Sequence, residues 1–505
     1  MAASTNDLSS SLDASQPALL YPDIFTIVCF NDSFQLALDH STIKTLLRVS
    51  RRARSLLSSK LARFHRWCQK EGLCHPDGQM RIGLTPSDQI ALSLHCKEKD
   101  PNDRSWLVVQ AEQGSAPASY FLARVLQIDV DRGGMRWIEW NAKLQEIFHH
   151  LETASSASHP MAQFHLAECY LNRIGVDQDQ IRAVEMYRSL ADCGMPQAQI
   201  ALGRCYESGE GVDQDYNTAI EQYTKAADQG CDNGRLRIVF LRGWFSFTGH
   251  GVEQSDEDAL AHWQQVSTQS TDPVIKSIAT HMVGWMHYLG RGTQQDQQKG
   301  IKMIRDSKSS AFKFGEAECL YGWPLAPSNS PASREFFKLC QLGLDHNWLC
   351  KHLTAVCLVH GFGTAQDKTK AADIFEQLAH DEHSESQAWF GGCYGNGLGV
   401  PEDESKAFEW YSKSANQGNS YGQLGVGWSY YDESGVPRDF AEAVKWFRKS
   451  AEQNNRDGQY ALGICFENGE GVTEDIDVAV FWYRKAAEHD QRRAINRLKS
   501  IGRWP

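Results

Sequence analysis

A glycine recurs along most of the chain at a nearly constant spacing, and this recurrence restricts the folds that the chain can adopt. The glycines stand at Gly175, Gly211, Gly251, Gly292, Gly363, Gly399, Gly435 and Gly471. The successive spacings are 36, 40, 41, 71, 36, 36 and 36 residues. A period of this length indicates an array of repeats rather than one globular core. Because the longest spacing is close to two periods, we expect one degenerate repeat between Gly292 and Gly363.

Each repeat has the pattern of two helices joined by a glycine turn. In one copy, Ala201 and Cys205 lie at helical spacing before the turn Gly209-Glu210-Gly211. Glycine suits a helix end because it accepts a positive φ. A second helix then carries Ala219 and Tyr223 on one face. Neither helix can bury its apolar face alone, so stacked repeats share a core. The sequence therefore predicts an all-α fold: a right-handed α-solenoid of helix-turn-helix repeats with a small N-terminal helical segment.

The aligned copies carry the features of a known family. The frame A-x-L-G-x-x-Y-x-x-G-x-G-V-x-x-D-x-x-x-A-x-x-x-Y-x-K-A-A-x-x-G is seen in residues 199–230, 387–418 and 459–488. It resembles the SEL-one-like repeat, a short relative of the tetratricopeptide repeat, over about residues 160–491. The resemblance implies a non-catalytic scaffold or adaptor that works through protein–protein interactions.

A short segment before the repeats has a second resemblance. A proline-led apolar stretch precedes the basic segment LLRVSRRARSL at residues 46–56. This order resembles an F-box, which docks on the Skp-family linker of a cullin–RING ubiquitin ligase, and it implies a substrate receptor. The docking residues would be Leu20, Pro22, Ile24, Ile27, Leu46, Leu47 and Val49. Ala53 stands where an F-box has a tryptophan, and the alternative is a helical cap over the first apolar face of the array.

The repeats and the F-box-like segment together set the expected domain organisation. We expect a flexible N-terminus at 1–17, an F-box-like helical segment at 18–62, a linker or helical cap at 63–104, a divergent first repeat with an insertion at 105–159, the repeat solenoid at 160–491 and a C-terminal capping helix or tail at 492–505.

Charge and hydropathy limit the classes of partner. The formal net charge of −12 gives no electrostatic basis for DNA binding or for general attraction to anionic membranes. The basic cluster from Arg48 to Lys70 leaves an RNA- or lipid-binding adaptor as an alternative function, and its simpler interpretation is a solvated helix face. No stretch has the run of about 18 apolar residues that a membrane span needs. The N-terminus lacks the basic start and apolar centre of a secretory signal, so we expect the protein in the cytoplasm, with the nucleus also open.

The sequence has no pattern of a cofactor, metal or catalytic site. It lacks G-x-x-x-x-G-K-[ST], and its G-x-G elements belong to helix–helix turns rather than to a strand-turn-helix unit. No paired C-x-x-C or H-x-x-x-H spacing accompanies Cys68, Cys74 and His75. There is no G-x-S-x-G elbow. We therefore expect no cofactor, no metal and no enzyme activity. A hydrolase assembled from distant residues on the repeat framework is the alternative.

Aromatic residues at one variable position of the repeats mark a candidate binding groove. The residue after the lattice glycine of the first helix is a tryptophan at positions 244, 285 and 428. If this position faces the concave side of the array, the aromatics form a stripe that suits an extended peptide or a helix of a protein partner. The alternative is that they fill wide gaps between irregular repeats. The candidate partner-binding residues are Trp244, Phe247, His250, Trp285, His287, Tyr288, Trp428 and Tyr431.

Overall fold

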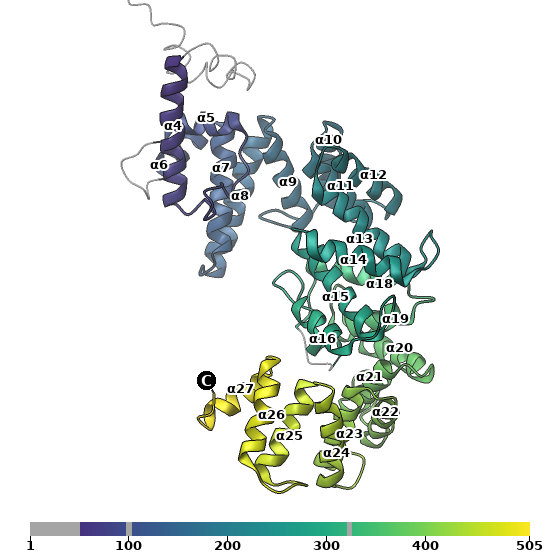
Figure 1. Ribbon diagram of the computed structural model, residues 1–505. Helices are drawn as coiled ribbons and strands as arrows, with labels where there is room; N and C mark the ends of the chain where they lie inside the picture. The colour runs from purple at the N-terminus through teal and green to yellow at the C-terminus, as the bar shows by residue number, and fades with distance from the viewer. Residues whose placement is uncertain (1–50, 97–103, 321–325, 505) are drawn as a thin grey trace, which may run out of the picture. The chain divides into compact units, whose positions relative to one another are not determined.

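The computed structural model describes residues 51–96, 104–320 and 326–504, and every regular element in these ranges is a helix (Figure 1). Isolated bridges join Cys74 to Met80 and Ser328 to Phe362. The helices follow one another in hairpins, so the predicted all-α solenoid of helix-turn-helix repeats is confirmed. The chain divides into two compact units between residues 193 and 194, inside the repeat array, at a boundary that the sequence did not predict.

The first unit holds the helices that precede the regular array, together with the first regular repeat. Its helices are α4 (Arg51–Lys70), α5 (Pro86–His95), α6 (Ser105–Glu112), α7 (Ala116–Asp131), α8 (Trp137–Ser156), α9 (Pro160–Asn172) and α10 (Gln180–Asp192). Phe64 of α4 packs on Phe121 of α7 with the ring centroids 5.5 Å apart. Trp67 of α4 packs edge-on to Trp106 of α6 at 5.3 Å. The C-terminal half of α4 therefore covers the core of this unit.

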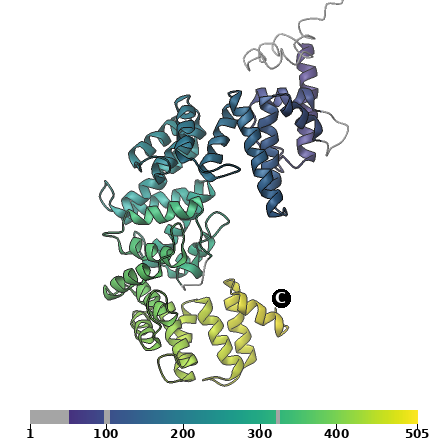
Figure 2. The same ribbon diagram turned by 180° about the vertical axis from the view of Figure 1, so that it is seen from behind.

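The second unit holds the remaining repeats (Figure 1 and, from behind, Figure 2). Its helices are α11 (Pro196–Ser208), α12 (Tyr216–Asp228), α13 (Asp232–Thr248), α14 (Asp256–Gln269), α15 (Pro273–Leu289), α16 (Gln297–Asp306), α17 (Glu316–Cys319), α18 (Pro331–Gln341), α19 (Trp348–His360), α20 (Lys368–His380), α21 (Ser384–Gly395), α22 (Glu404–Asn416), α23 (Ser420–Asp432), α24 (Phe440–Glu452), α25 (Arg456–Asn468), α26 (Ile476–Glu488) and α27 (Arg492–Ser500). Ala494 and Leu498 of α27 are buried in the last core cluster, so α27 closes the C-terminal end of the array.

In several turns the recurring glycine rests on the backbone of the preceding repeat, whereas nothing lies within 4 Å of the Cβ position of Gly251. Gly399, Gly435 and Gly471 have φ values of +79°, +72° and +73°. A Cβ atom on these three residues would lie 2.0, 2.1 and 2.1 Å from the carbonyl oxygen of the first residue of α20, α22 and α24. These turns therefore require glycine for two reasons: the φ angle is positive, and two backbones approach each other closely.

A second glycine sets the distance between the two helices of a repeat. A Cβ atom on Gly427 of α23 would lie 2.4 Å from the ring of Phe447 of α24. A Cβ atom on Gly463 of α25 would lie 2.5 Å from the ring of Tyr483 of α26. Both rings are buried. The missing side chain lets the aromatic ring of the second helix pack directly on the backbone of the first.

The degenerate repeat keeps only its second helix. Residues 307–320 stand in place of the first helix as irregular chain with the four-residue α17, and they bury Phe312 and Phe314. α18 follows, and a Cβ atom on Gly363 would lie 2.0 Å from the carbonyl oxygen of Ser333 in α18. The turn glycine of the next repeat therefore contacts the backbone of α18, as it contacts the second helix of a regular repeat elsewhere.

A buried arginine joins α18 to the early repeats of the second unit. Arg237 of α13 is 1% exposed. Its guanidinium nitrogens lie 2.6 Å from a carboxylate oxygen of Glu335 in α18, 2.9 Å from one of Asp272 and 3.8 Å from one of Glu207. One cation therefore faces three carboxyl groups in a site nearly closed to water. Such a site favours keeping a proton on one of the three.

Glu207 is the carboxyl group that keeps this proton. Burial and the nearby Glu335 raise its pKa to about 7, although Arg237 and the Tyr223 hydroxyl act in the opposite direction. The Tyr223 hydroxyl donates a hydrogen bond to Oε2 of Glu207. The Oε1 atom of Glu207 has no hydrogen-bond partner among the described residues. The protonation state of this buried site therefore changes close to neutral pH.

Replacing Gly435 by alanine is expected to destabilise the second unit. The new Cβ atom meets the carbonyl oxygen of Glu404 at 2.1 Å, in addition to the cost of a positive φ, which is about 1–2 kcal/mol. Gly251→Ala is the matched control, because Gly251 has a φ of +69° and nothing within 4 Å of its Cβ position. Urea unfolding followed by circular dichroism should give a lower midpoint for Gly435→Ala than for Gly251→Ala. Equal midpoints would contradict the close approach.

Glu207 is expected to contribute to the stability of the second unit at low pH, and this contribution is expected to decrease as the pH rises from about 4.5 to about 7. The pKa of Glu207 is raised from 4.5 to about 7 in the folded state, so folding retains a proton in this range and the contribution is lost as that proton leaves. Glu207→Gln removes the titration and should flatten this part of the plot of melting temperature against pH. Glu221→Gln, at an exposed position of α12, is the control and should leave the slope unchanged. Identical slopes for the two variants would rule out Glu207 as the proton holder.

Candidate interaction surfaces

The predicted aromatic stripe of the repeats is not accessible at most of its positions. Trp244, Phe247, Trp285 and Tyr288 are at most 2% exposed, and His287 is 5% exposed. The prediction of an open aromatic groove is therefore wrong at these five positions. The alternative, in which the rings fill space between irregular repeats, describes them correctly.

Later helices of the same unit cover these rings: α18 of the degenerate repeat packs on Trp244, and α19 of the following repeat packs on Trp285. Trp244 packs edge-on to Trp263 of its own repeat at 5.3 Å and to Phe336 of α18 at 6.3 Å. The carbonyl oxygen of Phe247 accepts a hydrogen bond from the side-chain amide of Asn347, which follows α18. An intramolecular helix thus occupies the place that the sequence assigned to a partner.

The remaining residues of the stripe keep part of their surface. Trp428 is half-buried and packs on Tyr431 at 5.3 Å and on Phe447 at 5.0 Å. Tyr431 donates a hydrogen bond to Glu470. His250 is exposed beside Phe245. Partner binding by Trp428, Tyr431 and His250 stays a prediction.

The F-box-like docking residues lie outside the described residues. They are Leu20, Pro22, Ile24, Ile27, Leu46, Leu47 and Val49. Of the basic cluster, Arg66 and Lys70 lie exposed on α4. Phe64, Trp67 and Cys68 on the same helix are buried. α4 is therefore amphipathic in its C-terminal half, as the interpretation of a solvated helix face requires.

The N-terminal end of α8 exposes two large apolar side chains. Trp137 is 73% exposed and Ile138 is 81% exposed. The ring of Trp140 stacks on that of Trp137 with the centroids 5.1 Å apart. Large apolar side chains that stay together in water are characteristic of protein interaction sites.

These side chains are exposed because the next repeat contacts α8 in its middle and not at its first residue. A Cβ atom on Gly175 would lie 2.1 Å from the carbonyl oxygen of Leu144, which is buried. In α20, α22 and α24 the corresponding contact is made by the first helical residue. α8 begins at Trp137, so residues 137–143 extend beyond the point at which the next repeat packs. We name residues 137–143 the α8 overhang.

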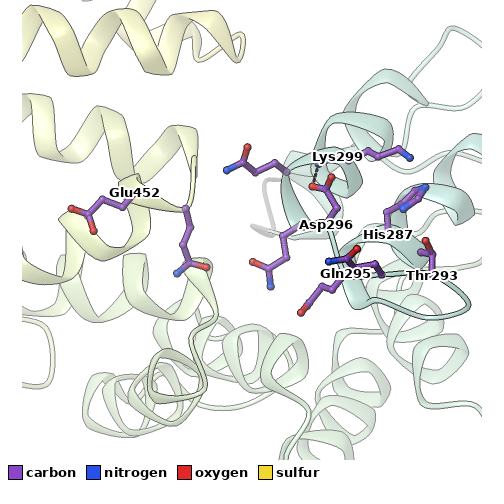
Figure 3. Close-up of a pocket in the computed structure, with 10 residues that line it drawn as sticks. His287, Thr293, Gln295, Asp296, Lys299 and Glu452 are labelled. Atoms are coloured by element: carbon purple, nitrogen blue, oxygen red, sulfur yellow. Dashed lines mark hydrogen bonds between the residues drawn. The ribbon is translucent and has the colours of Figure 1, made fainter.

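A polar cavity of about 650 Å³ lies in the second unit (Figure 3). One wall is the turn between α15 and α16, with His287 and residues 293–299. The other wall is the end of α24, with Glu452 and Gln453. No sequence pattern indicates this cavity, because its two walls are far apart in the chain and belong to different repeats.

A buried carboxylate joins the helices around this cavity. Glu316 of α17 accepts a hydrogen bond at 2.7 Å from Nε of Arg305 in α16 and another at 3.2 Å from the hydroxyl of Tyr421 in α23. Nη1 of Arg456 in α25 lies 3.7 Å from the same carboxylate. Arg305 also lies 3.3 Å from Nδ1 of His489, after α26. These contacts link α16 and α17 to α23 and α25, the helices on either side of α24, and to His489.

One buried pair, Cys319 and His281, is not arranged for nucleophilic chemistry. Sγ of Cys319 lies 3.8 Å from Nε2 of His281. Burial lowers the pKa of His281 to about 3 and raises the pKa of Cys319 well above its usual value. At neutral pH the pair is therefore a neutral imidazole and a protonated thiol, which is a poor nucleophile.

Two further properties concern the described ranges alone. Within residues 51–96, 104–320 and 326–504, no group of three or more His, Cys, Asp or Glu side chains is placed to hold a metal ion. Every helix of the same ranges is too short or too polar to span a bilayer.

Several solved structures are similar to the chain. A protective antigen of uropathogenic Escherichia coli strains that displays an SLR fold is 22% identical; the match covers 92% of this chain and 82% of that one, with a TM-score of 0.34. A Sel1 repeat protein from Oxalobacter formigenes is 23% identical over 79% of this chain and 89% of its own, with a TM-score of 0.27. Cysteine-rich protein B of Helicobacter pylori is 20% identical over 25% and 95%, with a TM-score of 0.23. No curated protein matched the chain.

A family model matches the repeats one by one. The Sel1 repeat model matches residues 160–195, 196–231, 240–269, 277–305, 349–383, 384–419, 420–455 and 456–491. Each match corresponds to one helix hairpin, from α9–α10 to α25–α26. The stretch with α17 and α18 lies between two matches. Because the matches together cover more than half of the sequence, the chain belongs to the Sel1 repeat family.

Proposed function

We propose that the chain is a non-catalytic scaffold that binds a protein partner through the α8 overhang, in the cytoplasm or the nucleus. The Sel1 repeats support the scaffold class, because such an array presents extended surfaces rather than a reaction site. The observation that carries the contact is the exposure of Trp137 and Ile138 in a folded helix.

The energetic argument rests on the two exposed side chains. Full burial of a large apolar side chain contributes roughly 1.5–3 kcal/mol. Tryptophan is also enriched among the residues that carry most of the energy of protein interfaces. Trp137 is already held by stacking on Trp140, so little side-chain freedom is lost when a partner covers it. The α8 overhang is therefore ready to bind without rearrangement.

The charges beside the α8 overhang indicate what kind of partner fits. Arg136 pairs with Glu139, and Lys143 lies 3.5 Å from Glu146. The charged groups beside the two apolar side chains are thus balanced, and they select neither an acidic nor a basic partner. The partner is accordingly a protein with an apolar pocket or groove that receives Trp137 and Ile138.

The double variant Trp137→Ala/Ile138→Ser is expected to weaken partner binding by at least about tenfold, because both anchors are removed. Ile181→Ser is the matched control, since Ile181 is a 66% exposed isoleucine of α10 in the same unit. The partner is first captured with the intact chain and identified by mass spectrometry. Its affinity for the three purified chains is then measured by calorimetry. Equal affinities for all three chains would contradict the proposed contact.

The finer form of the proposal makes the chain a substrate receptor of a cullin–RING ubiquitin ligase. Its support is the F-box resemblance of residues 18–62. In that form a Skp-family linker binds this segment, while the α8 overhang or the repeats bind the protein to be modified.

A purified Skp-family linker is expected to bind the full chain and to lose that binding when Pro22 and Leu47 are both changed to alanine. These residues lie at the two ends of the F-box-like pattern. The control is Trp137→Ala/Ile138→Ser, which leaves this pattern intact. A linker that fails to bind the full chain would refute the receptor form and leave the segment as a helical cap.

A further inference from the structure

Four residues join two parts of the second unit that lie far apart in the chain. They are Arg305 of α16, Glu316 of α17, Arg456 of α25 and His489, which follows α26. Glu316 is 4% exposed and accepts a hydrogen bond at 2.7 Å from Nε of Arg305. Nη1 of Arg456 lies 3.7 Å from the same carboxylate, and Nη1 of Arg305 lies 3.3 Å from Nδ1 of His489. We name these four residues the ionic latch, because they connect α16 to the last regular repeat.

The hydrogen bond between Arg305 and His489 requires a neutral imidazole ring. A guanidinium group can only donate, so Nδ1 of His489 accepts this bond and carries no proton. The carbonyl oxygen of His489 accepts a second bond, at 3.1 Å, from Nη1 of Arg456. A proton on Nδ1 would turn the acceptor into a donor and would place two cations next to each other. The ionic latch is therefore complete only while His489 is neutral.

The surroundings of His489 oppose its protonation. Partial burial, followed by the charge of Arg305, lowers the pKa of His489 from its ordinary value of 6.5. Arg456 acts in the same direction, whereas Glu316 and Glu488 favour the proton. When the ionic latch is open, the ring returns to water and its pKa to about 6.5. The open form therefore binds the proton more tightly, and a fall of the pH below 6.5 favours it.

The two residues that the last repeat contributes depart from the pattern of other repeats. At the position after the second helix, three other repeats carry a glutamine that donates a hydrogen bond to a glutamine of the first helix: Gln229, Gln417 and Gln453. The last repeat has His489 there, and Oε1 of its Gln459 has no hydrogen-bond partner among the described residues. The first helix begins with Ser384 and Ser420 in the two preceding repeats but with Arg456 in the last one. The last repeat therefore lacks an internal contact and has contacts with α16 and α17 instead.

We propose that the ionic latch is a pH-sensitive contact, which holds α16 against the last regular repeat at neutral pH and releases it in mild acid. Protonation of His489 removes the acceptor for Arg305, and the separation between α16 and α26 then increases. The ratio of closed to open molecules should fall by at most about tenfold for each unit of pH below 6.5. This inference concerns the second unit by itself and does not depend on the α8 overhang.

The distance between α16 and α26 reports the state of the ionic latch. Fluorophores for Förster transfer are placed at Lys302 of α16 and Arg484 of α26, which are both exposed. They are introduced as encoded amino acids, because the chain has 14 cysteines. The full chain should show lower transfer at pH 5.5 than at pH 8, with unchanged helical circular dichroism. A second pair, at Lys302 and at Lys276 of the neighbouring α15, should show the same transfer at both pH values.

His489→Gln separates protonation of this residue from other effects of acid. A carboxamide oxygen accepts the arginine hydrogen bond, but the group takes up no proton in this range. The transfer of His489→Gln should therefore be the same at pH 8 and pH 5.5. His383→Gln is the matched control, since His383 is also half-buried in the second unit and its pKa is also lowered by burial, but it stacks on Trp348. It should keep the pH response of the unchanged chain.

Four results would each overturn the proposal. They are equal transfer at the two pH values in the unchanged chain, a full pH response in His489→Gln, a response that is lost equally in His383→Gln, and a loss of the helical signal between pH 8 and pH 5.5.

Discussion

The contact between a turn glycine and the backbone of the preceding repeat is the constraint on which the rest of this structure depends. At Gly399, Gly435 and Gly471 the Cβ position is 2.0–2.1 Å from a carbonyl oxygen, so only glycine allows neighbouring repeats to reach their stacking distance. The contact survives where the repeat is degenerate, because Gly363 rests in the same way on α18. It also explains the α8 overhang, since Gly175 meets α8 at Leu144 instead of at its first residue. The exposed apolar side chains Trp137 and Ile138 therefore lie where a helix extends beyond this contact.

The degenerate repeat changes what the second unit can bind. Residues 307–320 and α18 bury Phe312, Phe314 and Phe336, and they turn the aromatic row of α13 and α15 into core. Arg237 holds α18 to the early repeats, and Glu316 joins α16 and α17 to the late ones. An array that fills its own aromatic groove must contact partners elsewhere. The surfaces left for that purpose include the apolar α8 overhang in the first unit and, in the second unit, the polar cavity and the partly exposed residues Trp428, Tyr431 and His250.

The repeat period, the two helices of each repeat and the degenerate position could be predicted from the sequence, because each depends on local residues that recur. The burial of Trp244 could not be predicted from the sequence. Its neighbours along the chain are the same whether the groove is open or filled, and the ring that covers it, Phe336, is 92 positions away in a segment that matches no repeat. The α8 overhang left a partial signal, because the apolar spacing of Trp137, Trp140 and Leu144 is regular. That spacing alone does not reveal where the next repeat stops covering the helix. The cavity beside Glu452 is lined by residues 293–299 and by the end of α24, two distant segments that no local pattern brings together.

The central claim is that α18 is a permanent part of the second unit and not an occupant that a partner displaces. Amide hydrogen exchange of the intact chain, read out by mass spectrometry, tests it directly. If the account is correct, the amides of α18 exchange as slowly as those of α13 and α15, because all three helices share one core. Exchange of α18 on the timescale of an exposed loop, while α13 and α15 remain protected, would contradict it and would return the aromatic row to the set of accessible binding surfaces.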